Sequence, residues 1–223
     1  SANNDKMVVN NASFEYNKTK GTLKGILENY QSLGNETSNA TLVGNLVVDG
    51  LVINELYGKR RSTATETKSS GDLIPVKFRL KAELTNFQYN DFTAKSLKGN
   101  LLSNRVKIEM PKCEVIALDG ITIASIGLKK WGENYLLDIN SDIKNVNITK
   151  LFRQFNNFEQ SEITDKHLSG QLFGNIITKV ILDNNYEPIL PKLYAKANFK
   201  IENGALIGYE PLKELSAFVN VSD

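Results

Sequence analysis

The side chains that could do acid–base, nucleophilic or metal chemistry are few in this chain of 223 residues. It has one histidine, His167, and one cysteine, Cys113. A single histidine rules out a histidine-rich metal site, and neither a Ser-His-Asp nor a Cys-His arrangement can be recognised in the sequence. A single cysteine forms no internal disulfide. We interpret Cys113 as a small, partly buried thiol rather than a reactive nucleophile.

Carboxylates and glycines give no clearer sign of a site. Asp138, Asn140 and Asp142 have the spacing of the first half of a calcium loop. However, Ile143 stands where that loop needs glycine, and Thr149 stands where it needs a bidentate glutamate. No glycine-rich phosphate loop follows a predicted strand. The remaining acidic residues are scattered, which leaves paired-acid glycoside chemistry open but gives it no support. We therefore predict a protein that is not an enzyme, with no catalytic residue, no metal and no cofactor.

The overall charge and hydrophobicity narrow the class of protein further. There are 27 basic and 25 acidic residues, so the formal net charge is +2. We therefore expect no nucleic-acid partner of the kind that binds through bulk positive charge. Hydrophobic residues make up 41% of the chain, which is typical of a folded rather than a disordered protein. No stretch approaches the roughly 20 apolar residues needed to span a bilayer.

The elements that would position any site are predicted to be strands. Within Leu168–Leu182 the even positions are small or apolar apart from Thr178, and within Leu193–Ile201 the odd positions are apolar. Alternation with a period of two is typical of a strand with one buried face, because successive side chains point to opposite sides of the pleat. The Asn203-Gly204 pair after the second run indicates a tight turn.

The same pattern recurs through the rest of the chain. Val76–Leu84 alternates between apolar and charged residues and is the clearest amphipathic strand. Ile121 and Ile123 are expected to face inwards on a later strand. Leu-x-Gly-x-Leu occurs at irregular spacings, and glycines in mid-strand could let a sheet curl, with chance recurrence as the alternative. Turns are expected at Asp49-Gly50, where a hairpin would return through Leu51–Ile53, and also near Ser103-Asn104, Asp119-Gly120 and Trp131–Asn134.

Two short helices and one loop interrupt the predicted strands. Thr149 can cap a helix over Lys150–Phe158, in which one leucine and three phenylalanines share a face. Pro211 can begin a second helix that runs to Phe218. Residues 58–71 are polar and lack apolar periodicity, so we predict a mobile loop there.

These elements predict a mostly β fold: a long, curved antiparallel sheet with two short helices, in a single domain over residues 1–223. One face of this sheet should be apolar, because apolar positions alternate with polar ones along several strands. The positions that we place on the apolar face are Phe78, Leu80, Leu172, Ile176, Val180, Ala197 and Phe199.

The C-terminal part of the chain resembles the AsmA-like family. The segments FNNFEQSEITDKHLSGQLFGNI and ANFKIENGALIGYEPLKELSAF are similar to the C-terminal region of that family. Its pattern has a Phe-rich short helix, L-x-G strands and an nGxLxgyePlkxLs segment. The resemblance is clearest from about Val146 to the end and continues more weakly back through TAKSLKGNL and LDGITI. The motifs are turns and hydrophobic positions, so they are more specific for fold than for activity.

This resemblance implies a cellular location and a function for the protein. AsmA-like proteins are envelope proteins of Gram-negative bacteria, related to TamB and to lipid-transfer proteins with repeating β-grooves. The chain is then expected to be a periplasmic fragment of a longer protein that a membrane helix anchors in the cell envelope. Its expected role is in outer-membrane biogenesis, with an apolar β-groove that handles phospholipid between the membranes. The seven apolar positions become possible lipid-facing residues. The expected partners are phospholipid or acyl chains and the rest of the protein's own chain.

The same strands are compatible with a second class of protein. In an extracellular β-sandwich that binds glycan or protein partners, the apolar strand faces would close against each other. Geometry separates the two interpretations. A groove needs one apolar sheet face left open, and a sandwich needs two such faces packed together.

Overall fold

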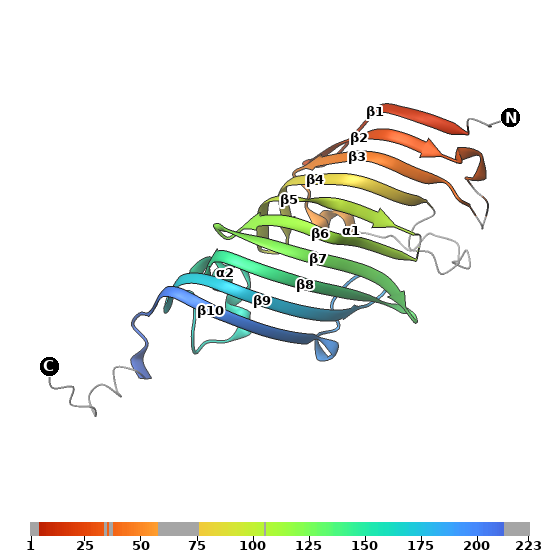
Figure 1. Cartoon of the computed structure of the whole chain (residues 1–223). Helices are drawn as coiled ribbons and strands as arrows, with labels where there is room; N and C mark the ends of the chain where they lie inside the picture. Colours follow the sequence, from red (N-terminus) through yellow and green to blue (C-terminus); the bar gives the residue numbers. More distant parts are fainter. Residues whose placement is uncertain (1–4, 34, 36–37, 58–75, 105, 212–223) are drawn as a thin grey trace, which may run out of the picture.

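The computed structural model of the protein describes residues 5–33, 35, 38–57, 76–104 and 106–211. These residues form one open sheet of ten strands, whose order in space follows the order along the chain. Figure 1 shows the sheet as a long, twisted and curved ribbon, with β1 at one edge and β10 at the other. The predicted fold class, a mostly β protein with a curved sheet and two short helices, is confirmed.

The strands are long and the helices are short. The strands are β1 (Lys6–Tyr16), β2 (Thr19–Glu28), β3 (Thr41–Asp49), β4 (Lys77–Tyr89), β5 (Phe92–Ser103), β6 (Lys107–Ala117), β7 (Gly120–Trp131), β8 (Asn134–Asn147), β9 (Leu168–Leu182) and β10 (Tyr194–Leu206). The α-helices in the described ranges are α1 (Ile53–Tyr57) and α2 (Ile148–Gln154), and single turns of 3-10 helix span Tyr30–Ser32, Asn156–Glu159 and Leu190–Lys192.

One connection departs from the expected antiparallel order. Neighbouring strands are antiparallel except β3 and β4, which are parallel, with Leu46 opposite Ala82. The predicted hairpin at Asp49-Gly50 is therefore wrong. Gly50 does have left-handed backbone angles (φ 67°), but its N–H donates to the Thr85 carbonyl of β4 at 3.0 Å. The chain then enters α1, a helix that the sequence did not predict.

The Asp49 side chain explains why the chain does not turn back. Its carboxylate accepts hydrogen bonds from the Thr85 hydroxyl at 2.6 Å and the Asn86 amide at 2.8 Å, and these two bonds lower the pKa of Asp49. Both donors lie on β4. The carboxylate therefore ties the end of β3 to its parallel neighbour. The predicted return strand, Leu51–Ile53, contributes only one isolated bridge to β4 and the first residue of α1.

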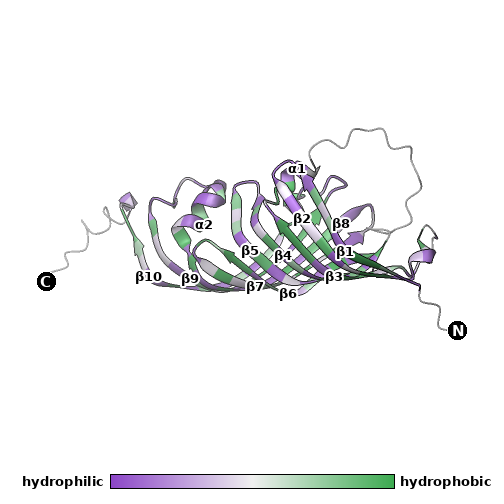
Figure 2. Cartoon of the chain, turned by 90° about the horizontal axis from the view of Figure 1, so that it is seen from above, coloured by the Kyte–Doolittle hydropathy of each residue, from purple (hydrophilic) through white to green (hydrophobic). Residues whose placement is uncertain are grey.

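The register of the strands separates the sheet into two faces. Directly paired residues of neighbouring strands share a face, and the sheet curls towards the side that carries α1 and α2, as Figure 2 shows. Side chains crowd together on the inside of a curved sheet, so the face with the most buried side chains is the concave one. One concave row crosses nine strands through Leu23, Leu46, Ala82, Gly99, Cys113, Ala124, Ser141, Ile176 and Ala197.

Glycines of the Leu-x-Gly-x-Leu motifs lie on the concave face where strands approach closely. Gly25 and Gly44 are opposite each other on β2 and β3, and a Cβ atom added to Gly44 would collide with the Lys24 carbonyl oxygen. A Cβ atom on Gly99 would lie 2.9 Å from the Cβ of Cys113. Glycine is therefore required for space at these positions.

A bulge changes which side chains of β6 face the concave side of the sheet. The register shifts between Met110 and Cys113, so both residues face the concave side although two residues, Pro111 and Lys112, separate them. Proline is tolerated in a strand at such a site because the regular ladder is already interrupted.

The turn predicted at Asn203-Gly204 is also a bulge. β10 runs on to Leu206, and its register against β9 shifts between Glu202 and Ala205. Asn203 absorbs the shift with a positive φ of 49°. The turn prediction is therefore wrong, because the left-handed backbone angles that Asn-Gly favours serve a bulge as well as a hairpin turn.

The helix predicted after β8 is shorter and differently capped than expected. Asn147 is the cap, since its side chain accepts a hydrogen bond from the Lys150 N–H at 3.0 Å. Thr149, the predicted cap, lies inside α2 and donates its hydroxyl to the Leu168 carbonyl at 2.5 Å. The helix does not reach Phe158, because residues 156–159 have positive φ angles.

Two predicted segments lie outside the residues that the structure describes. They are the loop over residues 58–71 and residues 212–218 of the second predicted helix. Both stay predictions.

Replacing Gly44 by alanine tests the close approach of β2 and β3. The new methyl group would meet the backbone of Lys24 and Gly25, which cannot swing aside as a flexible side chain can. We expect the free energy of unfolding, measured by urea titration, to fall by about 1–3 kcal/mol. Gly127→Ala on β7 is the matched control, because its Cβ would meet only the Lys107 side chain, at 3.5 Å. Equal losses in the two variants would contradict the steric explanation.

Candidate functional site

The concave face of the sheet is the candidate functional site. The strand register places all seven apolar positions predicted from the sequence on this face. Strands β4 and β9 are distant in the chain, yet they contribute to the same surface because neighbouring strands keep one register across the sheet. The contact of these residues with lipid stays a prediction. The seven are Phe78 and Leu80 on β4, Leu172, Ile176 and Val180 on β9, and Ala197 and Phe199 on β10.

The centre of the concave face packs on itself. Ala82, Met110, Cys113 and Ala124 form a buried cluster from β4, β6 and β7, in which Cys113 is only 1% exposed. Most of these side chains are small, and larger neighbours close over them: Leu84, Leu97, Leu101, Val115 and Ile126. A single curved layer thus buries its own central side chains and forms an apolar floor.

The edges of the same face are open to solvent. Leu172 on β9 is 4% exposed, whereas Phe199 on the neighbouring β10 is 58% exposed. On β1, at the far edge, Phe14 and Tyr16 are about half exposed. Large apolar side chains that remain in water at a sheet edge are candidates for contact with another molecule.

Helix α2 lies over one end of the concave face (Figure 2). The ring of Phe155, which follows the helix, lies 5.7 Å from the ring of Phe92 on β5, and the Phe158 ring stacks on Phe155 at 5.7 Å. The Gln154 side chain accepts the Thr93 N–H at 3.1 Å and donates to the Thr93 hydroxyl at 2.9 Å. These contacts attach the helix, which begins beside β9, to the start of β5.

The convex face carries ion pairs between neighbouring strands as well as apolar side chains such as Ile121. Lys98 lies 2.8 Å from Glu83 across β4 and β5, and this pair raises the pKa of Lys98. Lys179 lies 3.7 Å from Asp138 across β8 and β9. Charged side chains in this position keep one side of the sheet in water.

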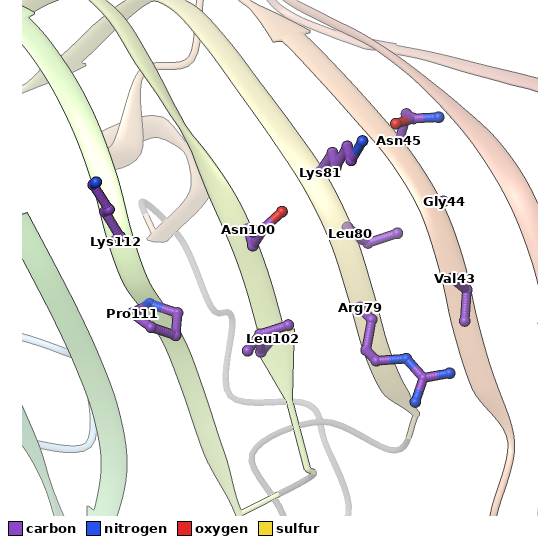
Figure 3. Close-up of a pocket in the computed structure, with 10 residues that line it drawn as sticks. All are labelled: Val43, Gly44, Asn45, Arg79, Leu80, Lys81, Asn100, Leu102, Pro111 and Lys112. Carbon is purple, nitrogen blue, oxygen red and sulfur yellow. The ribbon is translucent and has the colours of Figure 1, made fainter.

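A shallow hollow of about 530 Å³ lies on the convex face over β3 to β6. Figure 3 shows Arg79, Lys81 and Lys112 around it, together with the side-chain amides of Asn45 and Asn100. All five side chains are exposed. Because these cations are exposed to water and Arg79 already pairs with Glu28 at 3.6 Å, we assign no ligand to the hollow.

The single cysteine and the single histidine have different surroundings in the structure. Cys113 lies in the concave floor, where burial raises the pKa of its thiol. His167 accepts the Thr164 N–H at its Nδ1 atom, 3.2 Å away, and its ring packs edge-on against Tyr209.

The suggested calcium ligands lie in a regular strand rather than a loop. Asp138, Asn140 and Asp142 are residues of β8, and Asp138 pairs with Lys179. Within the described ranges, no three histidine, cysteine, aspartate or glutamate side chains gather closely enough to hold a metal ion. None of the helices in those ranges has both the length and the apolar character to cross a membrane.

Sequence reasoning placed two side chains on the wrong face and missed several that belong to the floor. Ile121 and Ile123 were predicted to face inwards, but Ala124 holds the concave position on β7, and Ile121 is 42% exposed on the convex side. Gly120 takes the concave place at the start of β7 because a Cβ there would collide with the Asn145 backbone. The floor residues on β6 were missed because its bulge changes which positions face inwards. Pro111, inside the predicted strand region, could have signalled that bulge.

A scan against protein-family models finds no match for the chain, and no curated protein matches it significantly.

The reactivity of Cys113 tests the closed packing of the floor. Its thiol is buried and its pKa is raised, and the thiolate is the form that reacts with disulfide reagents. We expect modification by such a reagent at pH 8 to be about 100-fold slower, or more, in the folded protein than in urea. Lys112→Cys supplies an exposed thiol next to it and should react at once. Rapid reaction of the folded wild-type protein would show that the floor is open.

Asp165 gives a pH test of the segment around α2. Arg153 Nε donates to the Asp165 carboxylate at 3.0 Å, and this bond lowers the pKa of Asp165 below about 3.8, its ordinary value. The stabilisation is therefore present above the unfolded pKa and is lost as the pH falls through the lower folded pKa. Asp165→Asn should be less stable than wild type at pH 7, and the two thermal midpoints should converge on acidification below about pH 4. A constant difference at all pH values would contradict this.

Proposed function

We propose that this protein is a non-enzymatic segment of a cell-envelope protein of the AsmA type, whose concave face handles phospholipid acyl chains between membranes. The observation that carries the proposal is the apolar concave face, which runs across the sheet and which the described residues do not cover with a second sheet. The proposed setting is the periplasm of a Gram-negative bacterium, and the proposed process is outer-membrane biogenesis. A membrane helix elsewhere in the full-length protein would provide the anchor.

The energetics of acyl chains support this proposal. A chain of 16 carbons in water costs about 13 kcal/mol, at about 0.8 kcal/mol per CH₂ group. An apolar trough lowers that cost by burial alone and needs no catalytic group. The buried floor around Cys113 and the exposed apolar side chains at the edges fit such a trough, because they offer an apolar surface several strands wide.

The distribution of charge supports binding without strong head-group preference. Ion pairs such as Lys98–Glu83 lie on the convex side, away from the floor. The concave rows include a few neutral polar side chains, such as Ser141 and Thr178. A surface of this kind responds to the length of an acyl chain more than to the charge of its head group.

The alternative interpretation was an extracellular β-sandwich that binds glycan or protein. A sandwich needs two sheets packed face to face, and the residues that the structure describes form one sheet. Binding of glycan or protein is a separate question, but the geometry that would give it a sandwich scaffold is not present in these ranges.

A matched pair of substitutions on β9 tests the proposal. Ile176 lies on the concave face and Ile181 lies on the opposite face of the same strand, and both are half-buried. We expect Ile176→Lys to weaken binding of a fluorescent or photocrosslinkable fatty acid by about tenfold or more, because a charge within the trough must be desolvated. Ile181→Lys should leave acyl binding nearly unchanged. Circular dichroism and urea titration of both variants will show that loss of binding is not loss of folding.

Two results would overturn the proposed function. One is a folded wild-type protein that retains no lipid in native mass spectrometry and takes up no photocrosslinkable acyl probe. The other is an equal effect of the two substitutions on binding, because the concave face would then have no special part in it.

A further inference from the structure

Strand β10 presents a long backbone edge that no described residue covers. It pairs with β9 on one side only, and all of its residues are exposed. Unpaired N–H and C=O groups along such an edge are a template for another strand. The opposite edge is less suitable, because a bulge interrupts β1 between Val9 and Ala12. β10 keeps a regular register from Tyr194 to Glu202.

We propose that β10 pairs antiparallel with β10 of a second copy of this chain, with the two-fold axis passing through Phe199. Local two-fold axes in an antiparallel ladder are perpendicular to the sheet, so the two concave faces would lie on the same side and form one continuous surface. The interface is closed by its symmetry, since the same strand is used by both copies. Addition of a strand at a free edge is a common mode of protein association.

The side chains of β10 are complementary to themselves in this register. Lys196 lies opposite Glu202 of the second copy, and symmetry repeats the pair. Lys196 has no ion partner among the described residues, while Glu202 lies 2.9 Å from Lys200 of its own strand and can accept a second cation. On the concave face, Ala197 lies opposite Ile201, and Phe199 meets its own counterpart. Opposite charges and apolar pairs across a ladder are both stabilising.

Neighbouring registers lose these advantages. Centring the ladder on Asn198 places Lys196 opposite Lys200 of the second copy. Centring it on Lys200 places that lysine opposite its own counterpart. Both registers are destabilised, because like charges then lie opposite each other. Centring on Ala197 leaves the lysines without a carboxylate opposite them. Centring on Ile201 brings the bulge near the end of β10 into the ladder. The charges and the bulge together therefore select the Phe199 register.

The same register gives a buried place to exposed apolar side chains. Phe199 is 58% exposed and Ile201 is 38% exposed in the single chain, and a second strand would cover part of both. Joined concave faces would also lengthen the surface proposed above for acyl chains. That consequence rests on the proposed function, but the pairing of the strands does not.

Cysteine crosslinking of the whole chain tests the register. Phe199→Cys should form a disulfide between two copies under mild oxidation, because directly opposite residues bring their Cβ atoms to about 5 Å and a small shift closes the bond. Ile201→Cys is the matched control, because it lies opposite Ala197 and not opposite itself, so it should crosslink poorly. The native Cys113 is buried and should not contribute.

Charge reversal tests the interface without touching the core. Lys196→Glu places two carboxylates opposite each other at both symmetric sites, so dimer affinity measured by analytical ultracentrifugation should fall about tenfold or more. The double change Lys196→Glu with Glu202→Lys restores opposite charges and should restore the affinity. Both side chains are exposed, so the fold of the monomer should not change.

Three results would overturn the inference. They are a wild-type chain that stays monomeric at all concentrations, a dimer that ignores the charge changes, and equal crosslinking by the two cysteine variants. A chain that stays monomeric but binds acyl probes would reject the pairing and leave the proposed function intact. A chain that dimerises but binds no acyl probe would support the pairing and reject the proposed function.

Discussion

The hydrogen-bonded register between neighbouring strands is the constraint on which the rest of this structure depends. Because side chains alternate along every strand, a shift of one residue in any pair would move its apolar side chains to the other face. The register holds instead from β2 to β10, so Leu46, Ala82, Cys113 and Ile176 all lie in one concave row. An apolar face thus forms from segments that are far apart in the chain.

Curvature is associated with residues that interrupt the regular strand pattern but keep the same face of the sheet apolar. Gly25 and Gly44 allow two strands to approach closely on the concave side, and the bulge after Met110 keeps both of its flanks facing inwards. Curvature in turn brings larger side chains over small ones such as Cys113 and Ala124. A single layer can then bury a core that would otherwise need a second sheet or a layer of helices.

A single sheet without a second layer leaves both apolar surface and a strand edge exposed. The proposed binding of acyl chains and the proposed pairing of β10 depend on these two features. The concave face is apolar and open, which suits an acyl chain, and the β10 edge is regular and unpaired, which suits another strand. The first surface offers burial of apolar groups, and the second offers backbone hydrogen bonds. Cys113 is part of the concave floor and is only 1% exposed.

The sequence by itself determined the local features. Period-two alternation in Val76–Leu84, Leu168–Leu182 and Leu193–Ile201 was sufficient to predict strands there and to assign the seven apolar positions to the apolar face of each strand, because alternation is a property of each strand alone. Tertiary structure decided the rest. Asp49-Gly50 and Asn203-Gly204 are compatible with a turn or with a bulge, and only hydrogen bonds to distant strands selected their actual roles. Asn147 rather than Thr149 caps α2, because the Thr149 hydroxyl binds the Leu168 carbonyl of a strand that follows later in the chain. The parallel pairing of β3 with β4 and the open concave face also depend on contacts between distant segments, which local patterns do not encode.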